Sequence, residues 1–478
     1  MIDHGQTGPI SLYLHFPFCE RKCRYCDFLS GPASEETREE YVQLLCREIT
    51  LRGRIAGRDA RCSVAGTAPV VSRAAAGGIT AGDLPDRGVA ANDRVDCCPL
   101  KVQVDTIFIG GGTPSLMTPV QLACVMKTVR DSYEVLPDAE ISLEVNPGTA
   151  DFTKLRAYRE AGVNRLSIGV QSLDDGELNL LGRIHKADQA REIFRAAREA
   201  GFDNINLDLM SALPGQTKES WSRTLRAAVE LGPEHISAYS LIIEDGTPFA
   251  AMYDAGQLSD LPSDEEDREI YHFTGKFLAE NGYRRYEISN YAKEGFACRH
   301  NCGYWTGHEY LGLGLGASSD FHGERFRNPD EIEEYGRAVA EAEACYEDYR
   351  EAISKDRNTE PCSGDNTLSQ ADAALRRERQ QMTPEDRMEE FMFLGLRMTC
   401  GISEKEFERR FGRSLEEVFG EVIRKQLQQG VIRRYAVSKN GADVNGGDSK
   451  EDIEEDHRIA LTEYGLDVAN HVMAEYLF

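Results

Sequence analysis

The chain has 478 residues and a formal charge of −26, from 55 Lys and Arg against 81 Asp and Glu, which disfavours a nucleic-acid binder because phosphate affinity depends on basic side chains. Its 41% hydrophobic and 28% charged residues are typical of a soluble globular protein with one large domain of about 250 residues and smaller ones. Since no apolar run approaches the ~18 residues that span a bilayer, and the first ten residues lack the basic and apolar regions of a signal peptide, we expect a cytoplasmic protein that meets membranes at most through its partners.

Short segments rich in β-branched and apolar residues recur through the first half of the chain, and each predicts a buried strand. They cover residues 12–16, 106–109, 141–145, 166–170, 205–209 and 236–241. Helical spacing separates them, as at Tyr41, Leu44, Leu45 and Ile49 after a predicted N-cap at Ser34. The alternation of strand and helix predicts right-handed βαβ units with a parallel sheet, arranged as a partial (β/α)6 barrel.

Three stretches interrupt this pattern. Residues 52–100 are rich in Ala, Gly and Arg without a clear period, so we expect an inserted loop there. Residues 344–381 and 439–456 are charged and polar, which indicates linkers or insertions. Helical apolar spacing from Met388 onward, and a closing helix predicted for residues 462–477, indicate a small α-rich, winged-helix-like C-terminal domain, for which the acidic balance favours a packing or partner role over DNA binding.

The cysteines are thirteen in number, and in a reducing compartment they stay thiols unless they bind metal or do redox chemistry. Cys19, Cys23 and Cys26 form a CxxxCxxC motif directly after the first predicted strand. An iron–sulfur cube has four irons, so three cysteine ligands leave one iron open to an external chelator. A zinc site would need a fourth soft ligand, for which only His15 lies near in sequence, and three unconnected thiols are the remaining alternative.

Polar and glycine-rich motifs follow the next strands, where a barrel carries its chemistry. The sequence GGGTPS over residues 110–115 follows the second strand and by itself indicates no more than a tight turn. Glu144, Gln171 and Asp208 lie at or near the ends of the third, fourth and fifth strands, and Arg183 follows Gln171 by one helical stretch. Asn146-Pro147 can simply end its strand, and Asp208 can cap the next helix.

The cysteine motif resembles that of the radical S-adenosylmethionine (SAM) superfamily, in which SAM chelates the open iron through its amino and carboxylate groups. The order CxxxCxxCDF, GGGTPS, ExNP, RLSIGVQS, LLGRIH, NLDLM and LPGQT is similar to one branch, the oxygen-independent coproporphyrinogen III oxidases and the related HemW-type heme chaperones. The resemblance covers roughly residues 11–330 and the C-terminal domain. It implies a radical SAM barrel over residues 1–245, an extension over 246–343 and a C-terminal domain over 382–478.

By this resemblance, Cys19, Cys23 and Cys26 bind a [4Fe-4S] cluster. The positions that contact SAM in the family are occupied here by Tyr13, Gly111, Gly112, Thr113, Glu144, Gln171, Arg183 and Asp208. Two features separate the chain from the oxidases. Phe28 stands where the oxidases carry a further cysteine, and only eighteen residues precede Cys19, where the oxidases have a longer extension.

The segment from His300 to Trp305 matches the HNxxYW motif of the HemW branch, and it implies contact between heme and His300, Tyr304 and Trp305. Imidazole can ligate heme iron, and the two aromatic rings offer flat apolar surfaces to the macrocycle. The alternative for His300 is a buried histidine that hydrogen-bonds to a neighbour. Cys298 and Cys302 flank it as incidental thiols or as further ligands.

We therefore predict a heme chaperone that binds heme and a SAM-ligated [4Fe-4S] cluster and delivers heme to acceptor proteins, whose basic faces its acidic surface would steer. Two enzymes are the alternatives. One is a coproporphyrinogen III oxidase that decarboxylates propionate side chains by radical chemistry, and the other is a radical SAM enzyme with another substrate.

Overall fold

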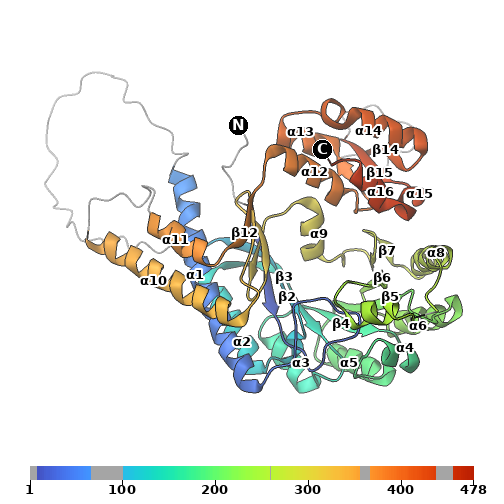
Figure 1. Ribbon diagram of the computed structural model, residues 1–478, viewed down its shortest axis with the longest axis horizontal. Coiled ribbons are helices and arrows are strands. Elements are labelled where there is room, and N and C mark those ends of the chain that lie inside the picture. The colour runs from blue at the N-terminus through green and yellow to red at the C-terminus, as the bar shows by residue number, and fades with distance from the viewer. Residues whose placement is uncertain (1–7, 66–100, 259, 356–365, 438–455, 478) are drawn as a thin grey trace, which may run out of the picture.

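The computed structural model of the chain describes residues 8–65, 101–258, 260–355, 366–437 and 456–477, and it contains one large mixed sheet and one small one (Figure 1). The large sheet comprises β1 (Ile10–Phe16), β2 (Gln103–Gly111), β3 (Glu134–Val145), β4 (Arg165–Gln171), β5 (Ile205–Ser211), β6 (His235–Ser240), β7 (Arg284–Arg285), β8 (Asn290–Ala292), β9 (Tyr310–Leu313), β10 (Ser318–Phe321), β11 (Glu324–Arg327) and β12 (Arg377–Gln381). Its strand order is β12-β11-β10-β9-β1-β2-β3-β4-β5-β6-β8-β7.

Helices connect and cover these strands. They are α1 (Glu35–Ala65), α2 (Pro119–Ser132), α3 (Phe152–Glu160), α4 (Asp175–Leu180), α5 (Ala187–Glu199), α6 (Lys218–Leu231), α7 (Pro248–Asp254), α8 (Asp264–Glu280), α9 (Arg299–Thr306), α10 (Ile332–Lys355) and α11 (Asn366–Ala374), with one 3-10 turn, η1 (Pro114–Leu116). Among the described residues, no helix combines the length and the apolar composition of a membrane-spanning segment.

The six predicted strands are confirmed as β1 to β6, which are parallel and adjacent in chain order. The partial (β/α)6 barrel is therefore also confirmed, and β9 extends it in parallel beside β1. On each strand, alternate side chains face opposite ways. In β4, for example, Leu166, Ile168 and Val170 belong to the buried hydrophobic core, whereas Arg165 and Ser167 line a cavity on the other face.

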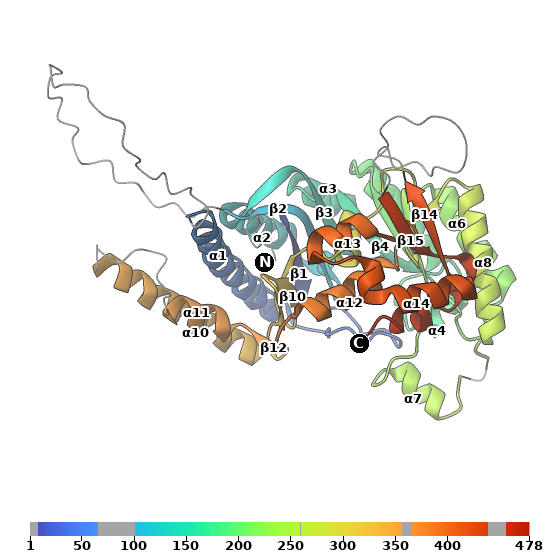
Figure 2. The same ribbon diagram turned by 90° about the horizontal axis from the view of Figure 1, so that it is seen from above.

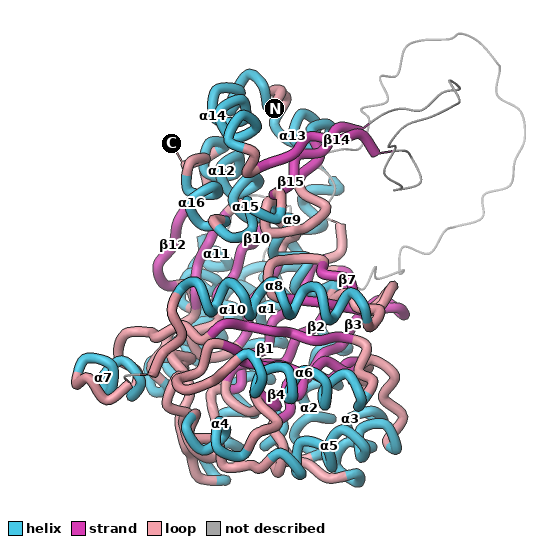
Figure 3. Tube along the Cα trace, turned by 90° about the vertical axis from the view of Figure 1, so that its right-hand side faces the viewer, coloured by secondary structure: helices cyan, strands magenta, loops and turns pink. Residues whose placement is uncertain are grey.

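The C-terminal domain is built from α12 (Pro384–Gly395), β13 (Ile402–Ser403), α13 (Glu404–Phe411), α14 (Leu415–Gln429), β14 (Ile432–Val437), β15 (Asp456–Leu461), α15 (Glu463–Asp467) and α16 (Ala469–Ala474). It has its own hydrophobic core, and β13, β15 and β14 form a small antiparallel sheet. Figures 2 and 3 show this domain beside the barrel, and Figures 1 and 3 show α9 between its helices and the main sheet.

The loop expected over residues 52–100 was wrong at its start, because α1 continues to Ala65; residues 66–100 lie outside the described residues. Gly53 indicated a loop in the sequence. In the structure it allows α1 to approach α2 closely, since a Cβ at this position would lie 2.8 Å from Cβ of Ser132. Ile55 and Ala56 are buried on the same helix.

The linker expected over residues 344–381 was also wrong where the structure describes it. That stretch contains the end of α10, all of α11, and β12, which closes the edge of the main sheet. Its polar sequence misled the prediction because an edge strand carries exposed charged residues that discourage pairing with other chains.

Two predictions for the C-terminal domain have different outcomes. The single helix expected over residues 462–477 is two short helices, because Val468 has a non-helical backbone (φ −121°, ψ 25°) between α15 and α16. The insertion expected over residues 439–456 lies outside the described residues except for Asp456, which begins β15.

We predict that Arg52→Met lowers the free energy of unfolding by about 3 kcal/mol, because it removes the cation that pairs with the buried carboxylate of Glu48. Arg52 is buried and forms ion pairs with Glu48 of α1, at 3.8 Å, and with Asp372 of α11. Urea denaturation followed by circular dichroism measures the loss. Arg156→Met, which breaks an exposed pair with Glu160, is the control and should cost under about 1 kcal/mol. Equal losses in the two variants would show that the buried pairs do not stabilise the fold.

Candidate functional site

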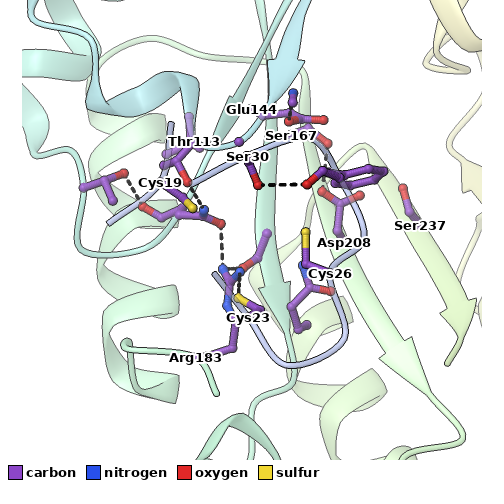
Figure 4. Close-up of a pocket in the computed structure, with 18 of the residues that line it drawn as sticks. Cys19, Cys23, Cys26, Ser30, Thr113, Glu144, Ser167, Arg183, Asp208 and Ser237 are labelled. Carbon is purple, nitrogen blue, oxygen red and sulfur yellow. Dashed lines mark hydrogen bonds between the residues drawn. The ribbon is translucent and has the colours of Figure 1, made fainter. Parts of the chain in front are cut away.

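A cavity of about 490 Å³ lies on the inner face of β1 to β6 and is closed on one side by the loop that carries the three motif cysteines. Figure 4 shows Cys19, Cys23 and Cys26 opposite Glu144, Ser167, Asp208 and Ser237, which project from β3, β4, β5 and β6. The cysteine loop follows the carboxyl end of β1, as expected for a barrel of this class. Thiols and carboxyl groups thus share one partly enclosed space.

Hydrogen bonds at both ends hold the cysteine loop in place. The amide of Cys19 donates to the carbonyl of Gly31 (3.0 Å), which closes the loop on itself, and the amide of Arg24 donates to the carbonyl of Leu181 (3.1 Å). The Arg21 guanidinium also donates to the carbonyl of Gly182 (2.7 Å). The loop is therefore tied to the segment between α4 and α5, which carries Arg183.

The thiols themselves are partly buried, and burial raises the pKa of both Cys19 and Cys26. The charge of Lys22 counters this effect by lowering the pKa of both thiols. Nη1 of Arg183 donates to Sγ of Cys23 at 3.5 Å. No three His, Cys, Asp or Glu of the described residues are grouped to hold one metal ion.

The glycine turn after β2 packs against the protein rather than against open space. A Cβ on Gly112 would lie 2.6 Å from the carbonyl oxygen of Phe18, and a Cβ on Gly111 would lie 2.5 Å from the His15 ring. Gly111 has φ +112°, which favours glycine. The amide of Thr113 donates to the carbonyl of Phe18 (2.7 Å), so the turn fixes the start of the cysteine loop.

Two carboxyl groups face the cavity, Glu144 from β3 and Asp208 from β5, with β4 between them. Burial, reinforced by the charge of Asp208, raises the pKa of Glu144 to about 8, although the Gly111 amide donates to its Oε2 at 3.0 Å. Burial also raises the pKa of Asp208, which accepts hydrogen bonds from Ser167 (3.0 Å) and Asn206 (2.8 Å). A cationic ligand would favour the ionised form of both groups.

Arg183 connects these elements. Its Nη2 donates to Oδ1 of Asn146 and to the carbonyl of Gly169, both at 2.6 Å, and Asn146 in turn donates to Oγ1 of Thr113 at 2.8 Å. Nε of Arg183 is buried and has no hydrogen-bond partner in the part of the chain that the structure describes. The sequence suggested that Asn146 ends a strand, but here it also joins the glycine turn to Arg183.

Gln171 and Tyr13 complete the predicted SAM positions. Gln171 closes β4 in the left-handed region (φ 64°) and lines the cavity. Tyr13 of β1 lines it as well, and its hydroxyl is 3.0 Å from Nδ1 of His15. All the residues predicted to contact SAM, and all three cysteines, line this one cavity.

The HNxxYW segment forms most of α9, and only part of it reaches the cavity. His300 and Tyr304 line the cavity, with His300 fully buried and stacked on Phe108 at 5.3 Å between ring centroids. Both ring nitrogens of His300 are hydrogen-bonded, Nδ1 to the Thr106 hydroxyl (2.8 Å) and Nε2 to the Tyr304 hydroxyl (2.9 Å). Burial lowers the pKa of His300 to about 3, so the imidazole is neutral at physiological pH.

The structure does not bring Trp305 to the cavity. Its ring lies under the guanidinium of Arg397 in the C-terminal domain, 4.3 Å from Cζ to the ring centroid. Side chains one residue apart on a helix point in different directions, which separates Trp305 from Tyr304. Cys298 is buried beside Glu140, and burial raises its pKa well above the ordinary value.

Several polar residues on the inner face of the barrel were not predicted from the sequence. Arg165, Ser167, Ser237 and Tyr239 line the cavity, as does Asn206 of the NLDLM motif. The signal was the strict alternation of polar and apolar residues in strands that were predicted from their apolar residues alone.

Comparisons with known proteins agree with this arrangement. A model of the radical SAM superfamily matches residues 98–228, and a model of the HemN C-terminal domain matches residues 382–436. The first match begins after the cysteine loop, whose interpretation therefore depends on its own residues and their place in the fold.

Several curated proteins are similar over most of the chain. The heme chaperone HemW of Bacillus subtilis (strain 168) is 34% identical over 423 residues, which cover 88% of this chain and 92% of that protein. The heme chaperone HemW of Escherichia coli (strain K12) is 37% identical over 311 residues, covering 65% and 69%. The solved coproporphyrinogen III oxidase HemN from Escherichia coli superposes with a TM-score of 0.68 at 21% identity, covering 98% of this chain and 90% of that one, which shows a shared fold.

We predict that the free energy of unfolding falls less in Glu144→Gln than in the wild type when the pH rises from 5 to 8. In the wild-type protein without ligands, the unfolded carboxyl loses its proton near pH 4.5 while the folded one keeps it to about pH 8, so the free energy of unfolding falls across this window. Gln cannot ionise, so its variant should lose less. Urea denaturation at pH 5 and pH 8 measures the difference. Glu160→Gln, on the exposed face of α3, is the control and should match the wild type; a Glu144→Gln profile that also matches it would contradict a raised pKa.

Proposed function

The chain belongs to the HemW family of radical SAM proteins, and we propose that it binds heme and delivers it to heme-acceptor proteins. The observation that carries the proposal is one cavity that is lined by the three motif cysteines and by His300 and Tyr304 of the HNxxYW segment. Membership of the radical SAM superfamily implies a [4Fe-4S] cluster and SAM, and the HemW relatives imply heme.

The cysteine loop fits the cluster. Cys19, Cys23 and Cys26 would each ligate one iron, and their chemistry is suitable because thiolates are the usual ligands of iron–sulfur clusters. Of the cysteines in the described ranges, no other lines the cavity, so a fourth iron would be free for SAM. Arg183, next to Cys23, offsets the negative charge of the ligated thiolates. A reducing compartment such as the cytoplasm is the setting we propose, because these thiols must stay unpaired.

The residues at the predicted SAM positions fit SAM, which is a cationic derivative of an amino acid. Glu144 and Asp208 present carboxyl groups of raised pKa that a cation would ionise, and Arg183 carries an unused buried Nε that can donate to a carboxylate. Tyr13, Gln171 and the turn of Gly111, Gly112 and Thr113 would complete the contacts. When bound, the cluster and SAM would stabilise the heme-competent form of the protein.

His300 is the residue that we propose as the heme ligand. The imidazole is neutral, so no proton competes with iron for it. Nδ1 is held by Thr106, which leaves Nε2 as the atom that becomes available when the Tyr304 hydroxyl moves away. Tyr304 would contact the macrocycle through its ring. Trp305 would act on α9 from the C-terminal side and not touch heme.

The cavity mouth suits the transfer of an apolar molecule. Phe28, Ile184 and Tyr239 line the cavity and also expose their side chains, by 62%, 51% and 38%. Exposed apolar groups at the edge of a binding site favour contact with a partner. The net charge of −26 would steer acceptor proteins with basic faces toward this protein.

We predict that the anaerobically reconstituted protein contains about four irons and four sulfides per chain, and that Cys23→Ala lowers both because it removes one cluster ligand. Iron and sulfide analysis with visible absorption spectra measures this. Cys345→Ala, on α10 and away from the cavity, controls for the loss of one thiol. A wild-type protein that binds zinc alone, or a Cys23→Ala variant with full iron content, would refute the cluster.

We predict that hemin titration of this protein gives a saturable Soret band. His300→Ala should raise the dissociation constant at least about tenfold, equivalent to ~1.4 kcal/mol, because it removes the iron ligand. Tyr304→Phe keeps the ring and removes the hydroxyl that competes for Nε2, so affinity should stay equal or rise. Trp305→Phe is the control from the same helix and should bind as the wild type does.

The heme titration also separates the outcomes. Absence of saturable binding in the wild type would remove the chaperone function. Unchanged binding in His300→Ala would assign the iron to another ligand, and weaker binding in Tyr304→Phe would show that the hydroxyl contacts heme.

A further inference from the structure

Arg165 is a buried cation that the proposed function does not yet use. It opens β4, is 1% exposed and lines the cavity. Its one hydrogen bond within the described structure is a long one, from Nη1 to Oγ of Ser142 at 3.4 Å, and Nε is buried without any partner. A guanidinium is always charged and has five donor hydrogens, so this one keeps most of its capacity for a ligand.

The carboxylates around Arg165 are committed to other groups. Glu140 accepts the amides of Arg299 (3.0 Å) and His300 (3.2 Å) at the start of α9. Asp208 accepts from Ser167 and Asn206. None of the ion pairs found among the described residues includes Arg165. Burial lowers the pKa of Arg165, but nearby charges, those of Glu140 and Asp208 among them, raise it overall. These carboxylates offset the charge from a distance without accepting a hydrogen bond from the guanidinium, and an anionic ligand would supply that acceptor.

The position of Arg165 indicates which ligand reaches it. Arg165 is the first residue of β4, and Gln171 is the last. Gln171 lies at the end of the strand that is near Arg183 and the cysteine loop. The six residue steps of strand between the two positions span about 20 Å. A SAM carboxylate would stay with the cluster iron at the far end. His300 is at the same end as Arg165, close enough for the Arg165 charge to contribute to its lowered pKa.

We propose that Arg165 binds a carboxylate of the tetrapyrrole that His300 contacts, which in heme is a propionate. This inference rests on the proposed heme function and adds a residue that selects macrocycles with free carboxylates. Arg165 would donate through Nε and the free part of its guanidinium, in the charge-assisted pairing that arginine forms with carboxylates.

The test compares heme with heme dimethyl ester, which lacks the propionate charges. Spectroscopic titration of the wild type should show tighter binding of heme than of the ester. Arg165→Met should weaken heme binding on the order of tenfold to a hundredfold and leave ester binding unchanged, so that the preference disappears. Arg165→Lys should keep part of the preference. Arg226→Met, which removes an exposed charge on α6, is the matched control and should leave both affinities unchanged.

Each other outcome has a definite meaning. Equal wild-type affinity for heme and ester overturns the inference without any variant, even if Arg165→Met fails to fold. Equal weakening of both ligands in Arg165→Met also overturns it, because a structural role would have that effect. SAM binding is titrated in parallel, and a loss confined to SAM would assign the carboxylate to SAM and overturn the macrocycle assignment. A wild type that binds neither macrocycle would instead refute the heme function itself.

Discussion

The polar inner face of the parallel sheet is the constraint on which the rest of the structure depends. Parallel strands are usually covered by helices on both faces and are apolar on both. Here the outer residues of β4 and β5, such as Ile168 and Leu207, pack in the core, while Ser167 and Asp208 face inward. Buried polar groups need partners, so this face must be satisfied by internal hydrogen bonds or by bound ligands.

The internal hydrogen bonds meet that need only in part. Ser167, Asn206 and Asp208 satisfy one another across two strands, and Asn146 joins Thr113 to Arg183. Arg165 and Arg183 each have a buried Nε for which the described residues offer no hydrogen-bond partner. The carboxyl of Glu144 is held in its neutral form by burial at physiological pH. A ligand that carries both cationic and anionic groups would satisfy these polar side chains. We therefore infer that the cavity is a binding site and not only a polar core.

Helix α9 connects this cavity to the C-terminal domain. Its His300 and Tyr304 side chains face the cavity, while Trp305 packs under Arg397 and the carbonyl of Thr306 accepts from Arg410 at 3.0 Å. The two faces of one short helix thus join the lining of the cavity to the C-terminal domain.

The sequence by itself determined the order of the six strands, the CxxxCxxC loop and the polar strand ends, because strand periodicity and ligand spacing are local properties. The family assignment drawn from these motifs is confirmed by the HemW relatives. Only the tertiary structure decided that Gly53 lies inside a helix, that residues 377–381 close a sheet edge, that Trp305 packs under Arg397, and that Nε of Arg165 has no hydrogen-bond partner among the described residues. Each of these features depends on a contact with a segment that is distant in the sequence. The spacing of residues along the chain does not reveal such contacts.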